Sequence, residues 1–149
     1  MEMGKARAVG KIVKQAPDFT DLETWRLARE LRRLVYRLTA RFPQEENFGL
    51  TSQLRRAASS VTASIAEGFG RYSNLENIQL CRQSRSSIYE TRDHLTTALD
   101  ASYISKGEFE NADALAVSVI RIVNGYIRST RNLKKPATEI DWEWRAFRC

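Results

Sequence analysis

Four long segments of this sequence repeat apolar residues at intervals of three and four positions, and only a few residues separate one segment from the next. This spacing places the apolar side chains on one face of an α-helix. Because short connections force consecutive helices to pack antiparallel, the pattern predicts an all-α fold, an antiparallel up-down-up-down four-helix bundle. The chain has 149 residues with only 7 glycines and 3 prolines, which suits one domain of long helices.

Capping signals indicate where these helices begin. The Ser/Thr-x-x-Glu spacing of a capping box occurs at Thr20, at Ser73 and at Ser105, and the remaining helix is expected to start near Phe48. Gly68 is the last residue of the apolar stripe of the second helix, and we expect Gly68 and Gly70 to end that helix near Phe69. The third helix has the most polar seam, and we expect its buried residues to be Cys81, Ser84, Ile88, Thr91, Leu95 and Ala98.

The two ends of the chain differ in composition from the predicted bundle. Residues 1–17 carry four basic side chains without a sustained apolar period, and we expect a flexible basic arm there. The bundle is predicted to span residues 18–135. Residues 136–149 form a C-terminal tail that contains Trp142, Trp144 and Phe147.

Charge and composition restrict the location and the partners. A formal net charge of +6 and a pI near 9.6 favour contact with polyanions such as RNA or DNA. The chain has no apolar run of the length that a membrane span needs, so no membrane contact is expected. Two cysteines without disulfide or zinc spacing indicate a reducing, cytoplasmic location.

Histidine, the side chain that most often acts as a general base near neutral pH, occurs only once in this chain. Its single histidine, His94, lies in a run that we interpret as an exposed turn of the third helix. Gly68 and Gly70 lack the strand and the Gly-Lys-Ser/Thr ending of a phosphate-binding loop. We therefore expect no enzymatic activity, no catalytic residues, no cofactor and no metal.

The first helix carries the most informative predicted surface. Four arginines fall opposite its leucines, with Trp25, Arg32 and Tyr36 along one flank; the four are Arg26, Arg29, Arg33 and Arg37. Guanidinium groups bind phosphates and aromatic rings stack on bases, which would make this a nucleic-acid surface. Protein interfaces use the same residue types, and for Trp25 and Tyr36 an oligomer interface is the favoured interpretation.

Several motifs also resemble the bacterial 23S rRNA intervening-sequence protein family. They are Phe19 to Ala28, Phe42-Pro43 with Glu46, Phe48 to Ala58, Ser60-Val61, Ile65 to Gly68, and Gly70-Arg71. The third helix keeps Ser84, Ser87, Ile88 and Glu90 of the family pattern but has Ser86 in place of a glycine. The resemblance covers about residues 18 to 131.

This resemblance implies a four-helix bundle that often forms a ring-shaped homopentamer and has no known enzymatic activity. A related bundle, the accessory variability determinant of diversity-generating retroelements, binds reverse transcriptase and nucleic acid. Glu67, Arg71 and Glu90 form a polar signature, and we expect Glu67 in a buried or interfacial polar network.

Two functional hypotheses follow. The first is a non-enzymatic oligomeric protein that binds nucleic acid or ribonucleoprotein through the basic arm and Arg26, Arg29, Arg33, Arg37, Arg55 and Arg56. The second is an oligomeric scaffold or adaptor for another protein, with reverse transcriptase among the possible partners and the tail around Trp142 and Trp144 as its docking peptide.

Overall fold

A computed structural model describes residues 16–133 of the chain. Its four α-helices are α1 (Glu23–Thr39), α2 (Leu50–Phe69), α3 (Asn74–Asp100) and α4 (Lys106–Asn132). Short 3-10 helices, η1 (Phe19–Asp21) and η2 (Gln44–Glu46), precede α1 and α2. The described residues contain no strand, and the predicted all-α fold class is confirmed.

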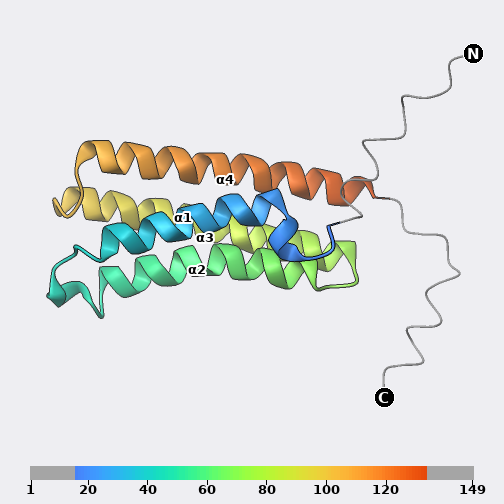
Figure 1. Ribbon diagram of the computed structural model, residues 1–149, viewed down its shortest axis with the longest axis horizontal. Coiled ribbons are helices and arrows are strands. Elements are labelled where there is room, and N and C mark those ends of the chain that lie inside the picture. Colours follow the sequence, from blue (N-terminus) through green and yellow to red (C-terminus); the bar gives the residue numbers. More distant parts are fainter. Residues whose placement is uncertain (1–15, 134–149) are drawn as a thin grey trace, which may run out of the picture.

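The helices form a closed ring in which each packs against two neighbours (Figure 1). Consecutive helices run antiparallel, and α4 completes the ring by packing against α1. The α1–α2 and α3–α4 connections lie at one end of the bundle, and the α2–α3 connection lies at the other. This is the predicted up-down-up-down arrangement.

Apolar side chains from all four helices fill the interior of the ring. Leu31, Leu54, Ile88 and Val119 are completely buried, one from each helix. The six residues predicted for the α3 seam are also buried, including its serine and threonine. Burying a large aliphatic side chain contributes about 1.5–3 kcal/mol, so this shared core stabilises the bundle.

The three predicted capping boxes have different outcomes. At Ser105 the box is present: the hydroxyl accepts from the Glu108 amide (3.1 Å), and the Glu108 carboxylate accepts from the Ser105 amide (2.8 Å). Ser73 occupies the N-cap of α3 without a side-chain cap bond. The prediction at Thr20 is wrong, because its hydroxyl donates to Asp18 (2.6 Å) within η1 and α1 begins at Glu23.

Gly68 lies in the last turn of α2, which ends at Phe69, and it is buried, as its place in the predicted apolar stripe indicates. Gly70 is the C-cap of the helix. A Cβ atom at Gly68 would lie 2.7 Å from Asn77 Oδ1 and 3.2 Å from Leu80 Cβ, both on α3. The missing side chain therefore allows α2 to approach α3 closely.

The predicted arm and tail lie outside the described residues, apart from Ala16 and Pro17 at the end of the arm. Within residues 16–133, no helix has a stretch long and apolar enough to cross a lipid bilayer.

Candidate functional site

The outer face of α1 presents Arg26, Arg29, Arg33 and Arg37, and all four are exposed. Arg26 forms an ion pair with Asp21 (3.2 Å), and Arg33 forms one with Glu30 (3.4 Å). Arg29 and Arg37 have no carboxylate ion-pair partner in the described part of the chain. Positive charge on this helix is therefore only partly compensated.

Two aromatic rings of α1 lie beneath guanidinium groups, one of them where α1 meets α2. The Arg29 guanidinium lies 5.8 Å from the ring centroid of Trp25, and that of Arg55 lies 4.8 Å from the centroid of Tyr36. Trp25 is half-buried, with its ring edge-on to Phe19 at 5.2 Å, and Tyr36 is 44% exposed. Each pair is a cation–π contact, which holds a cation against a flat ring.

Buried threonine hydroxyls hold two of the arginines at this junction. Arg32 donates to Thr62 Oγ1 (2.9 Å), and Arg55 donates to Thr39 Oγ1 (2.8 Å). Both hydroxyls donate in turn to carbonyls of their own helices, so their lone pairs are directed at the guanidinium groups. A neutral anchor positions a guanidinium group without cancelling its charge.

We define the α1–α2 face as Trp25, Arg29, Arg32, Tyr36 and Arg55. One end of this face contains an open hollow, lined by Thr20, Trp25, Arg26, Arg29, Glu30 and Arg32. The sequence pattern predicted Arg32 on this flank of the helix, but Arg32 was not among the predicted binding residues. The apolar period could not predict the hydrogen bond from Arg32 to Thr62, because Thr62 lies 30 positions further along the chain.

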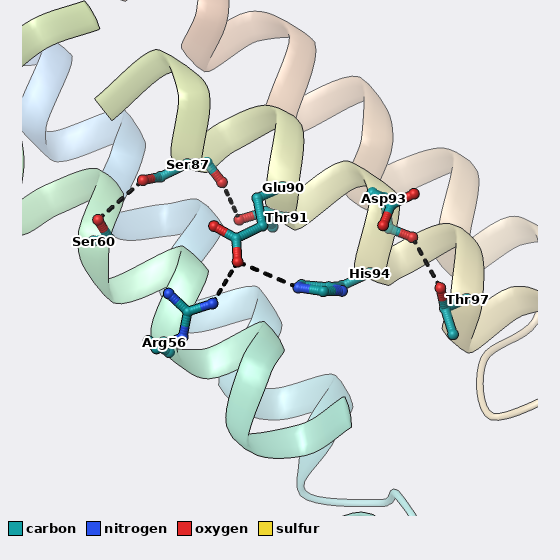
Figure 2. Close-up of polar contacts among 8 residues, drawn as sticks. All are labelled: Arg56, Ser60, Ser87, Glu90, Thr91, Asp93, His94 and Thr97. Carbon is teal, nitrogen blue, oxygen red and sulfur yellow. Dashed lines mark hydrogen bonds and ion pairs between the residues drawn. The ribbon is translucent and has the colours of Figure 1, made fainter. Parts of the chain in front are cut away.

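Arg56 belongs to a different surface from Arg55, although both were predicted to bind nucleic acid. Arg56 reaches across to α3 and donates to Glu90, as Figure 2 shows. Glu90 Oε1 also lies 3.5 Å from His94 Nε2. The charge of Arg56 is therefore paired locally, and the structure does not bring Arg56 into the α1–α2 face.

His94 is more buried than the sequence pattern predicted. Its side chain is only 15% exposed. Nε2 is buried and forms no hydrogen bond with the described residues, although the Glu90 carboxylate lies 3.5 Å away. The prediction of an exposed turn is wrong because α3 packs against α2 on one side and α4 on the other. The buried face of α3 is consequently wider than its six-residue seam.

Hydroxyl groups along the α2–α3 contact bond to one another or to carbonyl groups. Ser87 donates to Ser60 (2.9 Å), Thr91 donates to the Ser87 carbonyl (2.8 Å), and Ser84 donates to the Val61 carbonyl (2.8 Å). Figure 2 draws no hydrogen bond or ion pair that links the Ser60–Ser87 contact to the His94–Glu90 contact. These hydroxyls satisfy buried polar groups between packed helices.

Two further observations bear on chemical reactivity. Burial raises the pKa of the Cys81 thiol to about 11, so this thiol stays protonated at neutral pH and is a poor nucleophile. Among residues 16–133, no three His, Cys, Asp or Glu side chains gather in a group that could hold a metal ion.

The polar signature residues Glu67 and Arg71 lie at the end of α2. They form an exposed ion pair (2.8 Å), and the hydrogen bond to Glu67 raises the pKa of the Arg71 guanidinium. Glu67 is therefore not buried within a single chain, which leaves the interfacial alternative. Glu90, the third member, lies at mid-helix on α3 and pairs with Arg56.

Comparison with known proteins matches this chain to a protein family. Residues 20–125 match the family model described as 23S rRNA-intervening sequence protein. A similar solved structure is a protein of unknown function from the S23 ribosomal protein family of Bacteroides thetaiotaomicron VPI-5482. It has a TM-score of 0.66 and 17% identity, with coverage of 70% of this chain and 98% of that chain. At this identity the likeness shows the fold alone, and no curated protein matches the chain.

Proposed function

The chain belongs to the 23S rRNA-intervening sequence protein family, and we propose that it is a non-enzymatic protein that binds nucleic acid through α1 and the α1–α2 face. One observation carries the proposal. Arg29, Arg32, Arg37 and Arg55 have no carboxylate ion-pair partner among the described residues, although three of them contact aromatic rings or buried hydroxyls.

Uncompensated guanidinium groups on one side of a bundle attract the phosphate backbone of a nucleic acid. Each planar guanidinium can donate two parallel hydrogen bonds to phosphate oxygens. Arg26 and Arg33 can join them, because exposed ion pairs such as theirs contribute only about 0–1 kcal/mol and exchange readily. The family description names 23S rRNA, which makes RNA the first nucleic acid to test.

A scaffold for another protein is the alternative function, and exposed apolar side chains favour it. Phe48 is fully exposed in the α1–α2 connection, and Tyr72 and Leu75 are exposed near the α2–α3 connection. Such side chains are more stable when another chain covers them.

We propose a closed homo-oligomer, with five subunits preferred from the resemblance. We also propose a cytoplasmic location, which suits the free thiol of Cys81.

A salt titration with the full chain separates the two functions. We expect affinity for a structured RNA or a duplex DNA to fall steeply and log-linearly with salt, because each phosphate contact releases counterions. About three to four contacts would give a logarithmic slope near −3 on duplex DNA. Absence of binding at low salt would contradict the proposal and favour the scaffold.

A further inference from the structure

We infer that the α1–α2 face takes single-stranded nucleic acid, with bases stacked at the Trp25–Arg29 and Tyr36–Arg55 pairs and phosphates on the guanidinium groups between them. The inference rests on the proposed function and narrows its ligand from nucleic acid in general to an unpaired strand.

The positions of the two aromatic residues suit a strand rather than a duplex. Trp25 and Tyr36 lie 11 positions apart on α1, which returns them to nearly the same side of the helix, about 16 Å apart. Several nucleotides of a single strand cover this span, and their bases are free to stack. In a duplex the bases are already stacked inside, so the rings could contact only its backbone or groove edges.

The guanidinium groups of this face are positioned in advance. Arg32 lies between the two aromatic pairs and is held by Thr62, while Arg55 is held by Thr39 as well as by the Tyr36 ring. Because the anchors are hydroxyls, the face keeps its positive charge. A pre-positioned donor loses less conformational entropy when a phosphate arrives.

A similar aromatic pair elsewhere in the bundle shows what is special here. On α3, the Arg92 guanidinium lies 5.6 Å from the ring centroid of Tyr89, but it also donates twice to Asp113 (2.7 and 3.3 Å). The carboxylate cancels the charge of Arg92. Tyr89 therefore provides a matched aromatic control whose arginine is already neutralised.

The positive charge of this face also disfavours the predicted role of Trp25 and Tyr36 in an oligomer interface. A subunit that covered this face would bury Arg29, Arg32 and Arg55, and burying charges without partners costs several kcal/mol. A phosphate backbone brings the missing negative charges with it. The inference therefore assigns both rings to ligand stacking.

The first test follows the fluorescence of Trp25. The chain has 3 tryptophans, so Trp142→Phe and Trp144→Phe leave Trp25 as the only one. The probes are a single-stranded RNA of about 12 nucleotides and the duplex formed with its complement. We expect the single strand to quench Trp25 and to bind more tightly than the duplex.

Leucine substitutions then test the stacking itself. Trp25→Leu and Tyr36→Leu should each weaken single-strand binding about five-fold or more, because a stacked base is lost. Tyr89→Leu should leave the affinity unchanged. Circular dichroism and thermal unfolding verify that each variant is folded.

A third set of variants tests the positioning role of Thr39. Thr39→Val removes the acceptor for Arg55 without altering charge or shape, and we expect weaker single-strand binding. Thr39→Ser restores the hydroxyl and should restore the affinity. If Thr39 were merely structural, Thr39→Val and Thr39→Ser would both lose stability and binding, and to the same extent.

The outcomes distinguish this inference from the proposed function. Equal affinity for strand and duplex, with unchanged binding in Trp25→Leu, would overturn the inference and leave a general phosphate-binding face standing. If the protein bound neither the single strand nor the duplex, both the inference and the proposed function would be overturned. Loss of the oligomer in Trp25→Leu, seen by light scattering, with single-strand affinity retained, would return Trp25 to a subunit interface.

Discussion

The tight contact between α2 and α3 at Gly68 is open to a direct test through Gly68→Ala. The added Cβ atom would lie 2.7 Å from Asn77 Oδ1 and 3.2 Å from both the Asn77 carbonyl oxygen and Leu80 Cβ. The Asn77 side chain cannot move without cost, because it donates to Tyr126 (3.1 Å) and accepts from Cys81. The helices must therefore separate, or this polar contact must break.

The expected magnitude is a balance of three effects. Overpacking of a tight contact costs about 1–3 kcal/mol. Loss of the Asn77–Tyr126 hydrogen bond costs about 1 kcal/mol. Alanine is favoured over glycine inside a helix by about 1 kcal/mol, which offsets part of the cost. We predict that Gly68→Ala lowers the free energy of unfolding by about 1–3 kcal/mol.

Urea unfolding followed by circular dichroism measures this difference as a shift of the midpoint at constant slope. Gly125→Ala in α4 is the matched control, because a Cβ there would meet only Arg128 Nη2 at 3.8 Å. The control should stabilise the protein by up to about 1 kcal/mol. Equal stabilisation by both substitutions would refute the close α2–α3 contact at Gly68.

The remaining predictions concern the core and the α4 capping box. Ile65→Ala should cost about 2–5 kcal/mol in urea unfolding, because this completely buried side chain would leave a cavity, and a loss under about 0.5 kcal/mol would contradict its burial. Ser105→Ala should cost about 1 kcal/mol by the same measurement, whereas Ser73→Ala should cost much less because Ser73 makes no side-chain cap bond. The amide of Ser105 and the guanidinium of Arg41 lower the pKa of the Glu108 carboxyl, so its stabilising effect is present at neutral pH and is lost as pH falls below its ordinary value near 4.5. Glu108→Gln should therefore show a smaller drop in urea midpoint on acidification than the unchanged protein, and an identical drop would contradict this assignment.

Most of the fold could be predicted from the sequence because its signals are local. The apolar period identified the four helices, and the alternation of three- and four-residue steps identified the buried seam of α3, including Ser84 and Thr91. The predicted capping box at Ser105 was confirmed for the same reason, since its two partners lie within one helical turn. The capping-box prediction at Thr20 was wrong because the Thr20 hydroxyl donates to Asp18, two residues earlier, and the chain forms a 3-10 turn there.

Features that depend on distant partners could not be predicted in this way. The burial of His94 depends on how α3 is oriented between two neighbouring helices, and the role of Gly68 depends on Asn77 across a helix contact. In the candidate site, periodicity found the exposed arginines of α1 but could not tell that Arg56 pairs with Glu90. The anchors of Arg32 and Arg55 come from helix packing, which no local spacing records.

The most direct test of nucleic-acid binding compares two charge reversals. Arg29→Glu with Arg37→Glu reverses the two α1 arginines that lack a carboxylate partner in the described structure, and Arg121→Glu with Arg128→Glu reverses two exposed arginines of α4 that also lack one there. Each replacement removes two units of charge, so both variants lower the formal net charge of +6 by four.

The measurement is the affinity for single-stranded and structured RNA at low salt, with light scattering to follow the oligomeric state. We predict that the α1 variant loses affinity about ten-fold or more, with a salt slope smaller by about two, while the α4 variant stays close to the unchanged protein. Equal losses in both variants would show attraction by net charge alone. Unchanged affinity in the α1 variant would contradict the account.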